Sequence, residues 1–188
     1  MNNIIVLASA LAAFNNGMYD GFLIGKIRLY IEGTIAAAKA TAVKQKPNLA
    51  QLFVVGQNGQ GEQSGTMEVL LVNSRNAVQA AKGKPPVSLQ HCRHSEIVRH
   101  QFSKAEITNY LSQVQDTNPI HKGEKPVVPG ILLLAFLYDN WKAASVNWEV
   151  RFYSPCFAEE EISWYASEKQ ITGVQNQVCC VMITLKDR

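Results

Sequence analysis

Asp116-Thr117-Asn118-Pro119-Ile120-His121, with Pro129-Gly130 and the apolar run from Ile131 to Leu137 behind it, is the stretch that decides the expected fold and chemistry. Asn-Pro disfavours helix at Asn118 and predicts a turn, so the side chains of Asp116 and His121 converge on one pocket. A carboxylate and an imidazole placed in this way can hold a water molecule and exchange its protons near neutral pH. The segment therefore predicts an acid/base pair.

Pro129 and Gly130 predict the first turn of a buried helix. Proline is tolerated there because its missing N–H would have no intrahelical partner, and the next N–H groups carry the positive end of the helix dipole. Glycine allows a ligand to approach closely. A carbonyl oxygen placed there would be polarised as negative charge develops on it, which proton transfer beside a thioester requires. Gly130 is therefore the predicted oxyanion donor.

The pattern Asp-x-Asn-Pro-Ile-His, with a downstream Val-Pro-Gly and an apolar helix, resembles the MaoC-type (R)-specific enoyl-thioester hydratases, or 3-hydroxyacyl dehydratases, of the hotdog superfamily. The block from Val150 to Glu161 resembles the family's strand after its central helix, where a Phe and a Pro precede a turn. The resemblance covers roughly 97–188. It implies an α+β hotdog fold, in which Asp116 and His121 hold the water that adds across the 2,3 double bond and the Gly130 N–H binds the thioester carbonyl.

Further substrate contacts are expected around this turn. The two lysines in the set flank the site and are candidates for phosphate contact, although lysines in a polar loop are also commonly just solvated. The predicted substrate-binding residues are Asn118, Lys122, Lys125, Pro129, Phe152 and Phe157.

The chain departs from the family pattern at two places. Gln115 stands where the family commonly has Gly, and only seven residues, from Lys122 to Val128, separate the histidine from Pro-Gly. The short linker leaves no room for the helical stretch that the family usually has there. It therefore predicts a more open acyl pocket.

An internal duplication explains the first half of the chain. Ile27-Arg28-Leu29-Tyr30 matches Val150-Arg151-Phe152-Tyr153 at an offset of 123 residues, and the same offset aligns Ala8 to Phe14 with Ile131 to Leu137. We interpret this match as two copies of one unit. It predicts a double hotdog, with two central helices each wrapped by an antiparallel sheet, and one continuous sheet is favoured because pairing removes an unpaired edge.

The two predicted domains have different roles. Residues 1–86 form a degenerate N-terminal hotdog repeat that lacks the catalytic turn, and 87–188 form the C-terminal MaoC-like hotdog that carries it. The boundary is expected at Gly83-Lys84-Pro85-Pro86. The first half would be structural or would line the substrate pocket, with Leu7, Leu11 and Phe14 offered by its helix.

Local patterns predict the elements of both copies. Ser103 and Glu106 form a capping-box pattern, and the loop from Gly56 to Gly65 indicates a hairpin connection in preference to a phosphate cradle. Helices are predicted at 3–16, 75–82, 103–115 and from 130 onward; strands at 24–31, 36–44, 51–55, 67–73, 146–153, 162–168 and 178–185, with another ending at 101–102.

Composition narrows the class of protein. The 188 residues are 47% hydrophobic and 18% charged, which suits a chain that buries a sizeable core. A net charge of +3 is too weak to indicate nucleic-acid binding, but it suits anionic carriers such as coenzyme A or an acyl carrier protein. The apolar stretch from Ile4 to Phe14 has no Lys or Arg before it and is too short to span a membrane. A monomer and a homodimer both remain open.

The cysteines indicate a reduced, cytoplasmic protein. Cys92, Cys156, Cys179 and Cys180 show no Cys-x-x-Cys spacing, and the adjacent pair lies in a predicted buried strand. The cluster from His91 to His94 holds ligands too close together to share one ion without partners elsewhere. No metal and no cofactor are therefore expected.

The function expected from the sequence is that of a hydro-lyase. It would interconvert trans-2-enoyl thioesters and (3R)-3-hydroxyacyl thioesters of coenzyme A or an acyl carrier protein. Two alternatives stay open, an acyl thioesterase on the same fold and a non-catalytic hotdog protein that binds acyl carriers.

Overall fold

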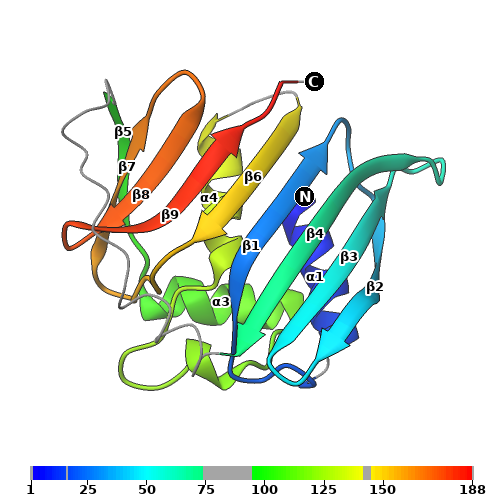
Figure 1. The fold of residues 1–188 in the computed structure, drawn as a ribbon, viewed down its shortest axis with the longest axis horizontal. Coiled ribbons are helices and arrows are strands. Elements are labelled where there is room, and N and C mark those ends of the chain that lie inside the picture. Colours follow the sequence, from blue (N-terminus) through cyan, green and yellow to red (C-terminus); the bar gives the residue numbers. More distant parts are fainter. Residues whose placement is uncertain (1, 16, 74–94, 142–144, 188) are drawn as a thin grey trace.

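One antiparallel sheet of nine strands forms the body of the protein in the computed structural model, which describes residues 2–15, 17–73, 95–141 and 145–187 (Figure 1). The strand order is β2-β3-β4-β1-β6-β9-β8-β7-β5. The strands are β1 (Phe22–Ile31), β2 (Ala37–Lys46), β3 (Leu49–Gln57), β4 (Gln63–Asn73), β5 (Ser95–Gln101), β6 (Val146–Phe152), β7 (Glu161–Ala166), β8 (Gln170–Gln175) and β9 (Val178–Leu185).

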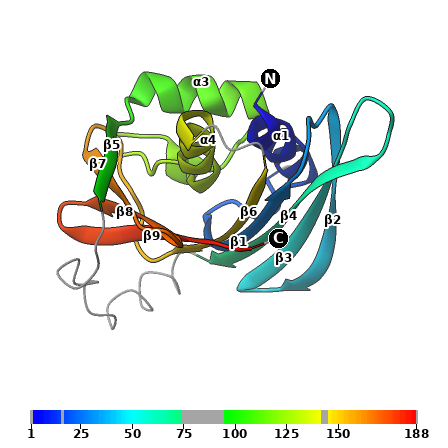
Figure 2. The same ribbon diagram turned by 90° about the horizontal axis from the view of Figure 1, so that it is seen from above.

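Two helices, α1 (Asn3–Asn15) and α4 (Gly130–Trp141), lie side by side against the concave face of the sheet (Figure 2). A third, α3 (Lys104–Val114), crosses them on the side away from the sheet. Its buried residues Ile107, Tyr110, Leu111 and Val114 recur at helical spacing and form the face that packs inward. A short 3-10 helix, η2 (Pro119–His121), follows α3. The α+β arrangement expected of a double hotdog is therefore present.

The two halves meet along the pairing of β1 with β6. Ile27 lies opposite Val150, and the pairs on either side of it are Lys26 with Arg151 and Arg28 with Glu149. Exchanging the halves at an offset of 123 residues maps this register onto itself, which confirms the strand part of the duplication. The helices follow the 123-residue offset less closely. Helix α1 begins at Asn3 and α4 begins at Gly130, so their starts depart from the offset by about one helical turn.

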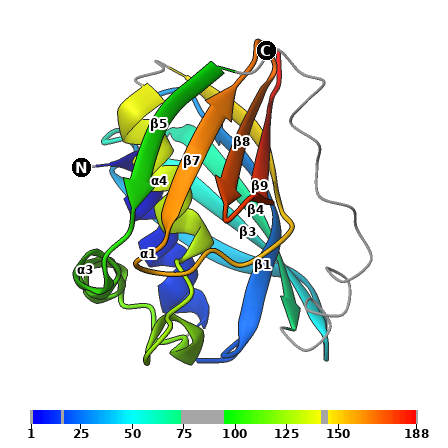
Figure 3. The same ribbon diagram turned by 90° about the vertical axis from the view of Figure 1, so that its left-hand side faces the viewer.

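The described elements divide between the two halves of the sheet. Strands β2, β3, β4 and β1 belong to the half that contains α1, and β6, β9, β8 and β7 belong to the half that contains α4. The second half also has β5 at the sheet edge (Figure 3) and α3, whereas the described residues before β1 hold only α1. The division into a degenerate first repeat and a second repeat that carries the catalytic turn stays a prediction.

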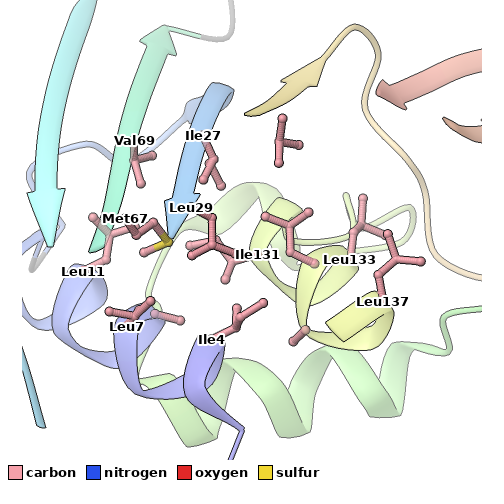
Figure 4. Close-up of a cluster of buried hydrophobic side chains, with 14 of the residues drawn as sticks. Ile4, Leu7, Leu11, Ile27, Leu29, Met67, Val69, Ile131, Leu133 and Leu137 are labelled. Atoms are coloured by element: carbon pink, nitrogen blue, oxygen red, sulfur yellow. The ribbon is translucent and has the colours of Figure 1, made fainter. Parts of the chain in front are cut away.

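The core fills the space between the helices and the sheet. Leu7 and Leu11 of α1 and Ile131 of α4 lie near Met67 and Leu29 of the sheet, whereas Leu133 and Leu137 lie on the side of α4 away from α1 (Figure 4). Burying each large aliphatic side chain contributes about 1.5–3 kcal/mol. The labelled members are Ile4, Leu7, Leu11, Ile27, Leu29, Met67, Val69, Ile131, Leu133 and Leu137.

Most predicted elements agree with the structure. The capping box of Ser103 and Glu106 is formed, and residues 58–62 join β3 to β4 as a hairpin. The sequence prediction missed β8, since Gly173 and its polar neighbours resemble a turn. A Cβ at Gly173 would lie 2.7 Å from Val181 and 2.8 Å from Trp164, so glycine allows the close packing of this buried strand.

Several sequence predictions lie outside the described residues. They are the helix at 75–82, the boundary at 83–86 and the cluster from His91 to His94 with Cys92. Cys156, Cys179 and Cys180 are buried free thiols. No helix among the described residues combines the length and apolar character needed to cross a membrane.

Candidate active site

The turn after α3 brings Asp116 and His121 together. Gln115 ends the helix in the left-handed conformation (φ 59°, ψ 36°), and its N–H donates to the Leu111 carbonyl. The Asn118 N–H then donates to Asp116 Oδ1 at 3.0 Å. Asp116 Oδ2 lies 3.8 Å from His121 Nε2, so the two side chains converge as the Asn-Pro turn predicts. This separation exceeds a direct hydrogen bond, and one water molecule can contact both atoms.

The surroundings of His121 define its protonation state. Its side chain is 9% exposed, and its Nδ1 lies 2.7 Å from the Val127 carbonyl oxygen. A carbonyl only accepts, so Nδ1 carries the proton and the Nε2 lone pair faces Asp116. Burial lowers the pKa of His121, although the Val127 carbonyl and the charge of Asp116 act in the opposite direction. Near neutral pH the imidazole is therefore uncharged, and Nε2 is a proton acceptor.

Gly130 begins α4 at the wall of the same cavity. The first N–H groups of a helix have no intrahelical acceptor and carry the positive end of its dipole. A Cβ at Gly130 would lie 3.0 Å from the ring of Phe152 and 3.5 Å from Ile24. Glycine therefore lets β1, β6 and the start of α4 approach one another closely.

The cavity that contains this turn has a volume of about 620 Å³, and both halves of the chain line it. It lies at the end of the seam between the halves, where β1 bulges between Ile24 and Lys26 and its pairing with β6 begins only at Lys26. Lining residues include Ala8, Leu11, Ala12, Phe22, Ile24, Tyr110, Asp116, Asn118, His121, Pro129, Gly130, Leu133, Phe152, Cys156 and Phe157.

The first half contributes to the lining differently from the prediction. Leu11 lines the cavity, whereas Leu7 and Phe14 do not. Leu7 is fully buried in the core and Phe14 packs against it. The cavity-facing side of α1 instead presents Ala8 and Ala12, whose small side chains leave room for a ligand.

The predicted phosphate contacts lie outside the cavity wall. Lys122 and Lys125 are exposed, and neither is among the lining residues. The Lys125 Nζ lies 2.9 Å from Glu160 Oε1 and 4.5 Å from the ring centroid of Phe157. Because Phe157 lines the cavity, Lys125 lies beside its rim, and its contact with substrate stays a prediction.

The short linker after His121 is fixed to the loop that follows β6. The Val128 N–H donates to the Cys156 carbonyl at 2.8 Å, and the Ala158 N–H donates to the Pro126 carbonyl at 3.0 Å. Val127, which accepts from His121, forms a bridge with Phe157. The linker therefore holds both the histidine and part of the cavity wall.

Tyr110 and Cys156 are among the cavity-wall residues that were not predicted from the sequence. Tyr110 is 5% exposed, and none of the described residues forms a hydrogen bond with its hydroxyl. Burial, with a smaller contribution from the charge of Asp116, raises its pKa, so the hydroxyl remains a donor. Cys156 is also buried, and contact with the Cys180 thiol raises its pKa. Tyr110 could have been found from its place on the apolar face of the helix that leads to Asp116.

Comparison with known proteins shows which solved structures share this fold. The chain matches no protein-family model and no curated protein. Among solved structures, a MaoC-like dehydratase superposes with a TM-score of 0.65 at 14% identity, covering 100% of this chain and 84% of that one. A conserved hypothetical protein from Mycobacterium tuberculosis with a double hotdog fold gives a TM-score of 0.57 at 12% identity, covering 98% and 81%.

Thioesterases are also among these structures. An acyl-ACP thioesterase from Bacteroides thetaiotaomicron gives a TM-score of 0.53 at 10% identity, covering 93% of this chain and 80% of that one. Identities this low establish the shared fold alone. The chain has a double hotdog fold, and its structural neighbours include MaoC-like dehydratases and acyl thioesterases.

Proposed function

We propose that the protein is a hydro-lyase that interconverts trans-2-enoyl thioesters and (3R)-3-hydroxyacyl thioesters. The observation that carries the proposal is the Asp116–His121 pair, with Oδ2 and Nε2 3.8 Å apart inside the cavity that α4 enters at Gly130. The pair supplies proton acceptors for a water, and the cavity supplies apolar walls for an acyl chain.

The acid/base step uses both side chains. Water donates one hydrogen toward His121 Nε2 and the other toward Asp116 Oδ2, which leaves an oxygen lone pair directed at C3 of the substrate. As the new C–O bond forms at C3, the electrons of the double bond move toward the thioester oxygen. The proton taken by the pair is then delivered to C2, so the elements of water are added and nothing is lost.

The oxygen of the thioester carries negative charge at the intermediate stage. The Gly130 N–H at the start of α4 is the group proposed to stabilise it, with the helix dipole adding to the same effect. Removing one such donor typically costs about 10²–10³-fold in rate. The acyl chain would extend between the walls formed by α1, α4 and Phe152.

A thioesterase is the second candidate, because an acyl-ACP thioesterase shares this fold. Hydration needs the water to reach C3, whereas hydrolysis needs it at the carbonyl carbon, and the same acid/base pair could serve either reaction. The products therefore distinguish the two candidates.

A single mixing experiment tests the proposal. Incubation with crotonyl-coenzyme A should reduce the enoyl-thioester absorbance without release of free thiol. Thiol release would instead support the thioesterase, and an unchanged substrate over a series of acyl chain lengths would support a protein that only binds acyl carriers. Parallel assays with acyl carrier protein thioesters would identify the carrier.

A further inference from the structure

Asn118 connects the catalytic turn to the other half of the chain. Its side chain is buried, with 7% of the residue exposed. The Asn118 Oδ1 accepts the Gly21 N–H at 3.0 Å, and its Nδ2 donates to the Phe22 carbonyl at 3.1 Å. One carboxamide thereby pairs with a donor and an acceptor on two successive residues, where the first half enters β1.

The same residue also organises the turn itself. Its backbone N–H donates to Asp116 Oδ1 at 3.0 Å, and its Oδ1 accepts the Ile120 N–H at 3.4 Å. Hydrogen bonds of Asn118 thus involve both Ile120, which precedes His121, and the carboxylate of Asp116. A shift of this side chain would change the separation of Oδ2 and Nε2.

The segment that bonds to the Asn118 side chain is itself fixed by hydrogen bonds within the first half. The Tyr19 N–H donates to Asn15 Oδ1 at 2.8 Å at the end of α1, and the Phe22 N–H donates to the Tyr19 carbonyl at 3.0 Å. Gly21 has φ +79°, although a Cβ there would find no atom within 4 Å. Its backbone conformation, and not a lack of space, therefore accounts for the glycine.

We infer that Asn118 is a positioning residue through which the first half holds the Asp116–His121 turn in its working geometry. The expected effect on kcat rests on the proposed function. The expected effect on the geometry of the turn rests on the hydrogen bonds alone. It gives the first half a role in the chemistry although that half carries no acid/base pair. Because its Oδ1 accepts two backbone N–H groups and its Nδ2 donates to a backbone carbonyl, the side chain of Asn118 acts through the turn, and its predicted contact with substrate stays a prediction.

Asn3 provides a matched control. It is 8% exposed, its Nδ2 donates to the Gly33 carbonyl at 2.8 Å and to the Tyr138 hydroxyl at 2.9 Å, and its Oδ1 accepts the Ile35 N–H at 2.8 Å. It does not line the cavity. Asn3→Ala therefore removes a buried carboxamide with a similar set of bonds at a distance from the turn.

The kinetic test compares these variants at equal folded fraction. Asn118→Ala should lower kcat by about 10–100-fold with a smaller change in KM, because misplacement of reacting groups by about 1 Å has effects of this size. Asn118→Asp, which keeps both accepting bonds, should retain more of kcat than the alanine variant. Asn3→Ala should lower the melting temperature and leave kcat unchanged. An equal effect of Asn118→Ala and Asn3→Ala on kcat would overturn the inference.

Amide hydrogen exchange tests the inference without any assay. The Gly21 and Asn118 amides donate to the turn as described above, and the Val127 amide donates to the Ile120 carbonyl at 3.0 Å. All three should exchange faster in Asn118→Ala and at the original rate in Asn3→Ala. Unchanged protection in Asn118→Ala would disprove the positioning role even if the wild-type protein is an active hydratase. An inactive wild type with faster exchange in the variant would instead reject the proposed reaction and retain the structural link.

Discussion

His121 donates its Nδ1–H to the carbonyl oxygen of Val127 across 2.7 Å, and this bond directs Nε2 toward Asp116. The bond joins the two ends of the short linker between the turn and α4. A linker that fixes the histidine tautomer therefore has a role beyond connecting two elements.

The first prediction concerns pH. Burial lowers the pKa of His121 below 6.5, so the neutral form required as a proton acceptor persists to lower pH than in a free histidine. We expect kcat/KM to stay level between pH 8 and about pH 6.5 and to fall only below that value. An acid limb centred above 6.5 would contradict this assignment.

The same shift has a consequence for stability. The unfolded chain takes up a proton at His121 more readily than the folded chain. The contribution of His121 to the free energy of unfolding is therefore complete above the pKa of the unfolded state. It is lost as the pH falls through the pKa of the folded state. Urea unfolding at several pH values would measure it. His121→Gln should reduce the loss of stability at acidic pH relative to the wild type.

The second prediction concerns Gln115, which adopts a left-handed conformation (φ 59°) at the end of α3. Glycine takes up this conformation without the steric cost of a Cβ. Gln115→Gly should therefore raise the free energy of unfolding by about 0.5–1 kcal/mol. Chemical denaturation would check this value, and destabilisation by the substitution would show that side-chain contacts outweigh the backbone preference.

The third prediction concerns Tyr110, whose hydroxyl faces no partner among the described residues and lines the cavity beside Asp116. We expect it to donate to the water held by the acid/base pair. Tyr110→Phe should lower kcat/KM by about tenfold, the equivalent of one hydrogen bond, without lowering the melting temperature. Steady-state kinetics with a thermal melt would show whether the rate is instead unchanged.

The sequence predicted local features better than contacts between distant segments. Repeated residues around Ile27 and Val150 predicted two equivalent strands, which pair directly because they lie on the axis that relates the halves. The hydrogen bond from Gly21 to Asn118 spans 97 residues and uses a backbone N–H, so no side-chain pattern indicates it. Strand β8 was missed because packing against Trp164, and not local preference, makes Gly173 suitable for a strand.

The fourth prediction concerns acyl chain length. The cavity of about 620 Å³ has apolar walls from both halves, so added methylenes should find contacts worth about 0.8 kcal/mol each until the wall ends. We expect medium or bulky acyl groups to be accepted with weak discrimination by length. Measurement of kcat/KM along a series of enoyl thioesters would test this, and a steep preference for four carbons would contradict it.

The central claim is that Asp116 and His121 catalyse hydration of an enoyl thioester. The most direct measurement is the hydration rate of an accepted enoyl thioester by the wild type, Asp116→Asn and His121→Ala, with circular dichroism to show that each variant is folded. Each substitution should reduce turnover by about 10²–10⁴-fold, as expected when a positioned acid/base is removed. Full hydration rates in both folded variants would show that the chemistry occurs elsewhere.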